Sequence, residues 1–193
     1  APHPKGLLPS SPVTPSLAAA VMNGKYVNAV PLYRLEKEFE RYGLARTRQN
    51  MANWMIRLAD EYLGVMYDYL HTKLYEFHVI QADETPVLVN KDGRPAGSKS
   101  YMWVYRSEYM YSDKQIVLYE YQRTRNASHP RQFLKDYSGV CVTDGYQVYH
   151  TVEKELEDLK IARCWVHCRR KFDEALKAVP KAAQKESLSY LII

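Results

Sequence analysis

The spacing of apolar residues changes near Phe77, and this change limits the possible fold more than any other feature of the chain. Before Phe77, apolar residues recur every three or four positions, which is the period of an amphipathic helix. After it, short runs rich in β-branched and aromatic residues alternate with turn signals and helical segments. The sequence therefore predicts an all-helical region over residues 17–76, followed by an α/β domain over residues 77–193.

The helical region predicts two helices joined by a short turn. Leu32, Leu35, Phe39 and Tyr42 recur at helix spacing, and Gly43-Leu44 ends that segment. Thr47 is a candidate N-cap for a second, longer helix that extends to about Tyr75. The apolar stripe of this second helix consists of Met51, Trp54, Met55, Leu58, Tyr62, Val65, Met66 and Tyr69.

Arg46, Arg48 and Gln49 lie at the start of the second predicted helix. Two helices with a short glycine-containing turn and polar residues at this position resemble a helix-turn-helix, in which Arg46 and Arg48 would bind DNA. An ordinary helical hairpin with solvated polar ends explains the same pattern. Both interpretations stay open at this stage.

Residues 1–16 contain five prolines among serine and threonine, and we expect them to be a tail or linker. The chain begins at Ala1 rather than Met and stops at Ile193 after an apolar run, so we expect a fragment or a single domain of a longer protein.

The second region predicts a mixed sheet with helices on its faces. Apolar runs at 77–83, 86–90, 101–106 and 115–121 are divided by turn signals at Asp92-Gly93 and Ser112-Asp113, which indicates a three-stranded antiparallel meander. Alternating helices and strands follow, and Pro180 marks the end of the last helix. These later segments are a helix at 128–137, a strand at 140–144, a helix at 146–159, a strand at 161–164 and a helix at 165–179.

Composition excludes several protein classes. Hydrophobic residues make up 46% of the chain, so a folded core is expected. No run of about 18 apolar residues predicts a membrane span, and no signal peptide opens the chain. Three cysteines, an odd number, favour a reduced cytoplasmic protein over a disulfide scaffold.

Positive charge is concentrated near the C-terminal end. The net charge is +5, and residues 160–185 hold eight lysines and arginines against Asp173 and Glu174. Such an excess suits a phosphate-rich partner such as DNA, because each neutralised phosphate releases counterions. A solvated basic helix face is the alternative.

Two aspartates follow apolar strand segments: Asp83 after residues 78–82, and Asp144 after residues 140–143. If the first strand of the meander lies beside the strand at 140–144, the two carboxylates meet at one edge of the sheet. Their repulsion would be removed by a divalent cation, and oxygen ligands favour Mg²⁺ or Mn²⁺. The alternative for either residue is a role in a turn or helix cap, especially for Asp144 before Gly145.

Several short motifs occur in an order that resembles the transposase of the bacterial insertion sequence 66 group. Each motif alone is weak, but the ordered set is specific and extends from about Met22 to Val179. The main motifs are Asp83-Glu84-Thr85-Pro86-Val87, Tyr101-Met102-Trp103-Val104-Tyr105, Asp144-Gly145-Tyr146 and Cys164-Trp165-Val166-His167-Cys168-Arg169-Arg170-Lys171-Phe172. Supporting segments are Lys25-Tyr26-Val27, Pro31-Leu32-Tyr33-Arg34, Asn53-Trp54, Ser128-His129-Pro130-Arg131 and Phe133-Leu134.

The resemblance implies a ribonuclease H-like fold with a DDE-type catalytic triad that uses Mg²⁺ or Mn²⁺. Such enzymes hydrolyse DNA at element ends and join the freed 3′ hydroxyl to target DNA, and we expect homo-oligomers on DNA. Asp83 matches the first acidic residue of the triad and Asp144 the second. No segment matches the third, a Glu, and neither Glu174 nor Glu186 has its context, so the catalytic domain is expected to be C-terminally incomplete.

The segment from Cys164 to Phe172 resembles a cysteine-histidine signature found near the active sites of DDE transposases. We expect Cys164 and Trp165 to pack in the core. His167, Arg169 and Arg170 would then lie on the helix near the groove, where these cations could neutralise DNA phosphates or orient the acidic cluster. Lys171 is a further expected DNA-binding residue. Two alternatives are a helix with a buried tryptophan and a solvated basic face, and a zinc site that combines Cys164, His167 and Cys168 with Cys141.

Two further functions compete with an active transposase. One is a non-catalytic DNA-binding remnant of a transposase, and the other is a different nuclease on the ribonuclease H-like fold. The long helical region before Phe77 weighs against a minimal nuclease, which would not need it.

Overall fold

The computed structural model of the chain describes residues 6–90, 93–108 and 114–192. The chain forms two compact units, Ala1–Tyr69 and Leu70–Ile193. The turn residues predicted at Asp92 and at Ser112-Asp113 lie outside the described residues.

The first unit is helical. Leu8 and Val13, in the segment that we expected to be a tail or linker, are buried in its core. The other buried core residues come from the helices: Ala18, Val21, Leu35, Met51, Trp54, Met55 and Leu58. The elements are α1 (Pro15–Met22), the π-helical segment η1 (Asn23–Val27), α2 (Leu32–Arg41), α3 (Arg48–Leu58), the π-helical segment η2 (Ala59–Leu63) and α4 (Gly64–Leu74), whose last residues belong to the second unit.

The connection between α2 and α3 follows the predicted turn chemistry. Gly43 has a φ of +76°, a backbone conformation that favours glycine, and it lies just beyond α2. Thr47 caps α3, because its side-chain oxygen accepts a hydrogen bond from Asn50 N at 3.2 Å. Both predictions are confirmed. The long second helix, however, is interrupted by η2, after which Val65 and Met66 of the predicted stripe are exposed.

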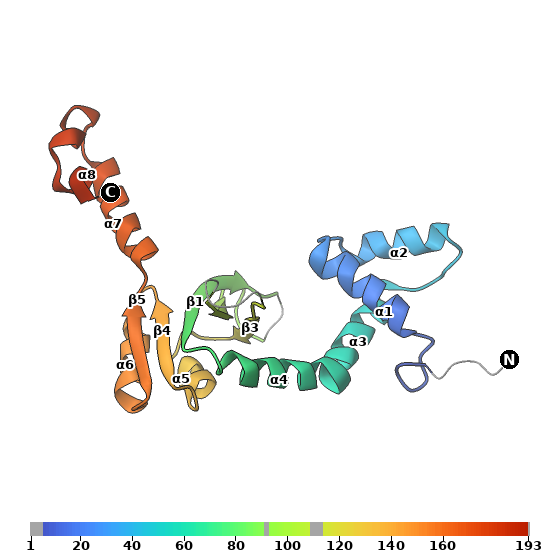
Figure 1. Ribbon diagram of the computed structural model, residues 1–193. Coiled ribbons are helices and arrows are strands. Elements are labelled where there is room, and N and C mark those ends of the chain that lie inside the picture. Colours follow the sequence, from blue (N-terminus) through green and yellow to red (C-terminus); the bar gives the residue numbers. More distant parts are fainter. Residues whose placement is uncertain (1–5, 91–92, 109–113, 193) are drawn as a thin grey trace. The chain divides into compact units, whose positions relative to one another are not determined.

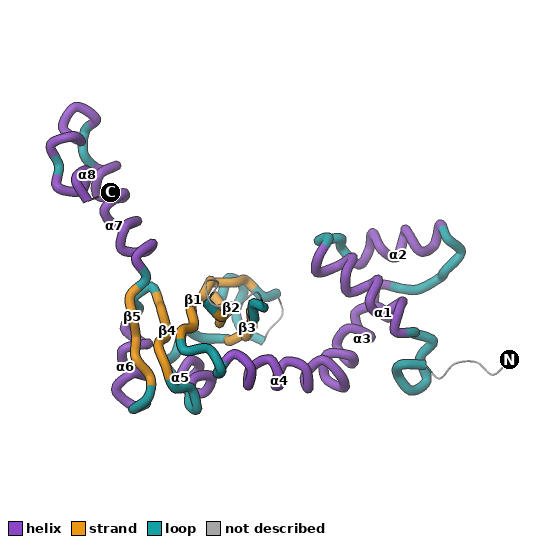
Figure 2. Tube along the Cα trace, in the orientation of Figure 1, coloured by secondary structure: helices purple, strands orange, loops and turns teal. Residues whose placement is uncertain are grey.

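The second unit contains a five-stranded mixed sheet in the order β3-β2-β1-β4-β5 (Figures 1 and 2). β1 pairs with β2 and β2 with β3 in antiparallel fashion, whereas β1–β4 and β4–β5 are parallel. The predicted mixed sheet, and the neighbouring positions of its first and fourth strands, are confirmed. The strands are β1 (Val79–Leu88), β2 (Lys99–Ser107), β3 (Val117–Gln122), β4 (Gly139–Thr143) and β5 (Leu159–Arg163).

One face of this sheet is covered by α5 (Ser128–Leu134) and α6 (Gln147–Glu155). The ring of Phe133 in α5 stacks on Tyr105 of β2 with centroids 3.5 Å apart, and Tyr149 of α6 meets Trp103 edge-on at 6.0 Å. Trp103, Tyr105 and Tyr149 are fully buried. This covered face is the core of the second unit, because alternate residues of each strand point into it.

Three helical segments follow β5: α7 (Trp165–Ala178), the 3₁₀ segment η3 (Lys181–Glu186) and α8 (Leu188–Ile192). In Figure 1, α7 leaves the sheet at the edge where β4 and β5 both end. The prediction that Cys164 and Trp165 pack in the core is wrong, because Trp165 is 83% exposed and Cys164 is only partly buried. Trp165 is the first residue of α7, directly after the N-cap Cys164, and no residue of this helix is buried.

Among the described residues, no helix has the length and apolarity that crossing a membrane would require.

Candidate active site

The pairing of β1 with β4 brings Asp83 and Asp144 together. Gln81 of β1 pairs with Val142 of β4 in the parallel register. Asp83 lies two residues after Gln81, and Asp144 lies two residues after Val142. Residues at the same level of adjacent parallel strands point to the same face of a sheet. The prediction that the two carboxylates lie close together is therefore confirmed, since both line one pocket. Asp144 lies one residue beyond the end of β4, but the expected strand-end position of Asp83 is wrong, because β1 continues to Leu88.

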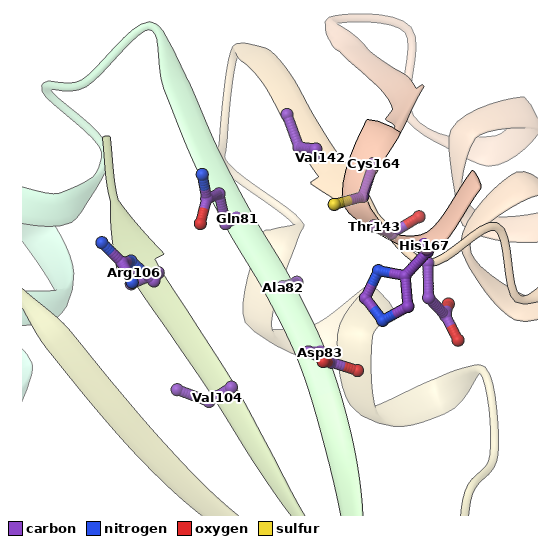
Figure 3. Close-up of a pocket in the computed structure, with 10 residues that line it drawn as sticks. Gln81, Ala82, Asp83, Val104, Arg106, Val142, Thr143, Cys164 and His167 are labelled. Carbon is purple, nitrogen blue, oxygen red and sulfur yellow. The ribbon is translucent and has the colours of Figure 1, made fainter. Parts of the chain in front are cut away.

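The two aspartates lie on the sheet face opposite α5 and α6, which we call the open face. Burial alternates along β1: Ile80, Ala82 and Glu84 are buried, whereas Gln81 and Asp83 are partly exposed. The open face carries a pocket of about 230 Å³ lined by both aspartates (Figure 3). Its other lining residues are Gln81, Ala82, Val104, Arg106, Val142, Thr143, Cys164 and His167.

The backbone near each aspartate holds one of its carboxylate oxygens. Asp83 Oδ1 accepts a hydrogen bond from Glu84 N at 2.9 Å, and Asp144 Oδ1 accepts one from Tyr146 N at 2.8 Å. Gly145, with a φ of +89°, allows the chain to turn directly after Asp144. Asp144 thus has the turn-forming role that its position before glycine suggested, and its carboxylate also lines the pocket.

A buried ion pair lies behind the acidic pair, on the covered face. The Glu84 side chain is fully buried, and its Oε1 accepts from Arg125 Nε at 2.7 Å while its Oε2 accepts from the Tyr149 hydroxyl at 2.8 Å. Arg125 Nη2 also lies 3.8 Å from Asp144 Oδ2, and its guanidinium stacks 3.7 Å from the centre of the Tyr146 ring. Arg125 therefore connects the core of the sheet to one of the two candidate metal ligands.

Burial raises the pKa of Glu84, and the hydrogen bonds from Tyr149 and Arg125 offset part of this shift. Sequence reasoning missed this network. Glu84 occupies one of the alternating buried positions of β1, and a buried carboxylate needs a hydrogen-bonding or charged partner. This position could have indicated that such a partner exists. Nothing local identified Arg125, which lies in the loop between β3 and α5.

The start of α7 forms one side of the site. Cys164 N donates to Thr143 O at 2.8 Å, which holds the first turn of α7 beside the end of β4. His167 lines the pocket, and its Nδ1 is buried without a hydrogen-bond partner. Arg170 and Lys171 line an adjoining hollow that both aspartates also border, whereas the exposed Arg169 lines neither cavity.

Arg46 and Arg48 belong to the first unit, at the start of α3. Arg46 Nη1 donates to Ala45 O at 3.1 Å, and the Arg48 guanidinium lies 5.9 Å from the centre of the Tyr33 ring. No observation of the first unit shows whether these two side chains bind DNA, so that role stays a prediction.

The residues of the pocket fit a metal ion only in part. Two carboxylates provide the hard oxygen ligands that Mg²⁺ and Mn²⁺ prefer. Within residues 6–90, 93–108 and 114–192, however, no cluster of three or more His, Cys, Asp or Glu side chains is placed to hold an ion. The zinc alternative is not supported either. Cys141 is fully buried on the covered face with its thiol pKa raised to about 12, whereas Cys164 lines the open face.

Comparison with known proteins identifies the family. The model of the Transposase IS66 family matches residues 10–192. The chain belongs to this family of transposases. The resemblance of the ordered motifs to the insertion sequence 66 group is thus confirmed.

Two relatives of the chain come from Sinorhizobium fredii. Uncharacterized protein y4qI is 32% identical over 190 residues, which cover 93% of this chain and 35% of the relative. Uncharacterized protein y4jD is 27% identical over 199 residues, which cover 99% of this chain and 39% of the relative. The chain therefore spans less than two-fifths of the length of either relative.

Proposed function

We propose that this chain forms the front part of a DDE-type DNA transposase in which Asp83 and Asp144 are the first two catalytic carboxylates. The observation that carries the proposal is the parallel register of β1 and β4, which brings the two aspartates to the same level of the open face. The order of a three-stranded meander followed by two parallel strands supports a ribonuclease H-like fold, as the family resemblance implies.

In this proposal, Asp83 and Asp144 hold Mg²⁺ or Mn²⁺ at the edge of the sheet. A bound divalent ion would activate the attacking oxygen and stabilise the leaving oxygen of a phosphodiester. The protein keeps the two carboxylates in place through the backbone hydrogen bonds of Glu84 N and Tyr146 N. The second oxygen of Asp83 is then available to an ion in the pocket, whereas an ion bound to Asp144 Oδ2 would share that oxygen with Arg125 Nη2, 3.8 Å away.

The proposed substrate is DNA at the ends of an insertion element, followed by target DNA. Arg170 and Lys171 border the hollow beside the acidic pair, and His167 lies in the pocket itself, so all three are placed to bind the backbone of a strand that reaches the aspartates. Arg169, together with Arg46 and Arg48 of the first unit, would add further phosphate contacts. Assembly of several copies on DNA is part of the same proposal.

A third acidic residue is needed for full activity, and we propose that the rest of the whole protein supplies it. The lack of a three-ligand cluster in the described part of the chain supports this view. The same lack of a cluster supports a second candidate function, a transposase remnant that binds DNA but catalyses no reaction. That remnant would bind DNA in a salt-dependent manner but would show no metal-dependent cleavage.

The test compares Asp83→Asn and Asp144→Asn in the full-length transposase, with Asp136→Asn as the control. The side chain of Asp136 is 72% exposed on the loop before β4 and lines neither cavity. Each pocket substitution should lower Mg²⁺-dependent cleavage of element-end DNA by about a thousandfold or more, because the metal loses a charged ligand. The control should cleave normally, and all three proteins should keep the thermal stability of the unmodified one.

Normal cleavage by both pocket variants would overturn the assignment of Asp83 and Asp144. If the unmodified full-length protein binds DNA but never cleaves it with Mg²⁺ or Mn²⁺, the remnant function is correct.

A further inference from the structure

The pocket on the open face contains a cation that the acidic pair does not explain. Arg106 of β2 pairs with Gln81 of β1, two residues before Asp83 on the same face. Figure 3 shows Arg106 on β2 across from Gln81, with His167 beyond Asp83 on the α7 side. The pocket is therefore bordered by a guanidinium on one side and an imidazole on the other, with both aspartates among its lining residues.

Neither basic side chain has a protein partner for its inner nitrogen. Arg106 Nε and His167 Nδ1 are both buried and make no hydrogen bond within the described part of the chain. Arg106 also makes no ion pair there, not even with Asp83. Leaving a buried donor unsatisfied costs about 1–3 kcal/mol, and more for a charged group.

An unsatisfied nitrogen alone does not identify a binding site, since Trp103 Nε1 in the core has no partner either. Arg106 differs from Trp103 in two respects. It carries a full positive charge, and it borders a pocket of about 230 Å³, the volume of several water molecules. A cation that borders a cavity and makes no ion pair within the described part of the chain is suited to an anionic ligand.

The ligand must satisfy the acidic pair as well as the cation. An anion that approaches Asp83 and Asp144 is repelled unless a divalent ion lies between them, whereas the same anion is attracted by Arg106. A phosphodiester has oxygens for both partners: one can coordinate the ion and another can accept hydrogen bonds from the guanidinium.

We propose that Arg106 is a phosphate-binding residue of this pocket. Its guanidinium binds a phosphodiester of the DNA strand that reaches Asp83 and Asp144, and His167 contacts that strand from the opposite side. The inference rests on the proposed transposase function and extends it, because it assigns a role in substrate binding to a residue of β2.

The experiment uses the full-length transposase and compares Arg106→Gln and Arg106→Lys with Lys99→Gln. Lys99 is an exposed residue at the start of the same strand, and it lines neither cavity, so its substitution removes one charge without altering the pocket. Binding is measured by fluorescence anisotropy with a short DNA duplex of arbitrary sequence, since phosphate contacts do not depend on sequence. Ca²⁺ replaces Mg²⁺ as the oxygen-coordinating ion.

Arg106→Gln should weaken binding about ten- to a hundredfold, the range for losing a charge-assisted hydrogen bond. The slope of log affinity against log salt should fall by about one. Arg106→Lys should recover the salt slope but only part of the affinity, because lysine keeps the charge and lacks the two-pronged geometry. Thermal stability should not fall in either variant, because Arg106 has no protein partner to lose.

Unchanged affinity and salt slope in Arg106→Gln would overturn the inference, as would an equal effect of Lys99→Gln. A loss of thermal stability that accounts for the weaker binding would also overturn it, because Arg106 would then be structural. The proposed function is tested separately, since an inactive Asp83→Asn protein supports it whatever Arg106 does.

Discussion

Glu84 on the covered face of the sheet and Arg106 on the open face differ in how their charged groups are satisfied. On the covered face, Glu84 is enclosed by Arg125 and Tyr149, and both of its oxygens accept hydrogen bonds. On the open face, Arg106 and His167 have buried nitrogens that find no hydrogen-bond partner among the described residues. The same strand, β1, thus carries a satisfied carboxylate at Glu84 and an acidic pocket residue at Asp83.

This contrast separates stability from function. A buried charge in the core must be paired, because an unpaired one costs several kcal/mol. Groups that are left unpaired in a pocket remain available to a ligand. Substitutions on the covered face are therefore expected to change the free energy of unfolding, and those on the open face to change binding and chemistry.

Among the substitutions of charged residues, the largest expected effect on stability comes from Arg125→Ala. Removing a buried partner costs about 3–5 kcal/mol, and we expect about 2–3 kcal/mol here at neutral pH because the Arg125 side chain is 36% exposed and partly solvated. Chemical denaturation of the second unit, residues 70–193, measures the loss. Lys135→Ala, an exposed cation of the same unit, is the control. Equal stability of both variants would mean that the Arg125–Glu84 pair does not stabilise the covered face.

A smaller effect is expected in the pH dependence of stability. Burial raises the pKa of Glu84 in the folded protein, so the folded state binds its proton more tightly than the unfolded state does. Relative to Glu84→Gln, the unmodified protein should be most stable below the ordinary carboxyl pKa. It should lose stability as the pH rises through the raised pKa.

The measurement is urea unfolding of both proteins over a series of pH values from acid to neutral. A difference in stability that stays constant across this range would show that burial does not perturb Glu84. A difference that changes in the opposite direction would show that Arg125 and Tyr149 outweigh burial.

The smallest effect is expected for Trp165→Ala. This side chain is 83% exposed, so its removal should change the free energy of unfolding by no more than about 0.5 kcal/mol. Trp103→Ala is the matched comparison, because Trp103 is fully buried on the covered face and its loss should cost about 3–5 kcal/mol. Similar losses in the two variants, measured by thermal unfolding, would contradict the exposed position of Trp165.

Much of the fold could be predicted from local pattern. Three predicted features depend on neighbouring residues alone, and the structure has each of them. They are the change from helical to strand spacing of apolar residues near Phe77, the helix cap at Thr47 and the turn at Gly43. The position of Asp144 just after a strand was predictable for the same reason, whereas Asp83 was wrongly expected at a strand end, because β1 continues past it to Leu88. The break of the long helix at η2 was not predictable, because no proline or glycine marks residues 59–63.

Other features depend on contacts between residues far apart in the chain. The register of β1 and β4 aligns Asp83 with Asp144, although 61 positions separate them, and sequence could only suggest this from the expected strand order. The sequence could not identify Arg125 as the partner of Glu84, because Arg125 lies in a loop whose path depends on the packing of α5. The prediction that Trp165 is buried was wrong, because the sequence does not show which residues pack around an aromatic side chain. Local chemistry sets the elements and their ends, whereas burial and pairing arise only when the strands assemble.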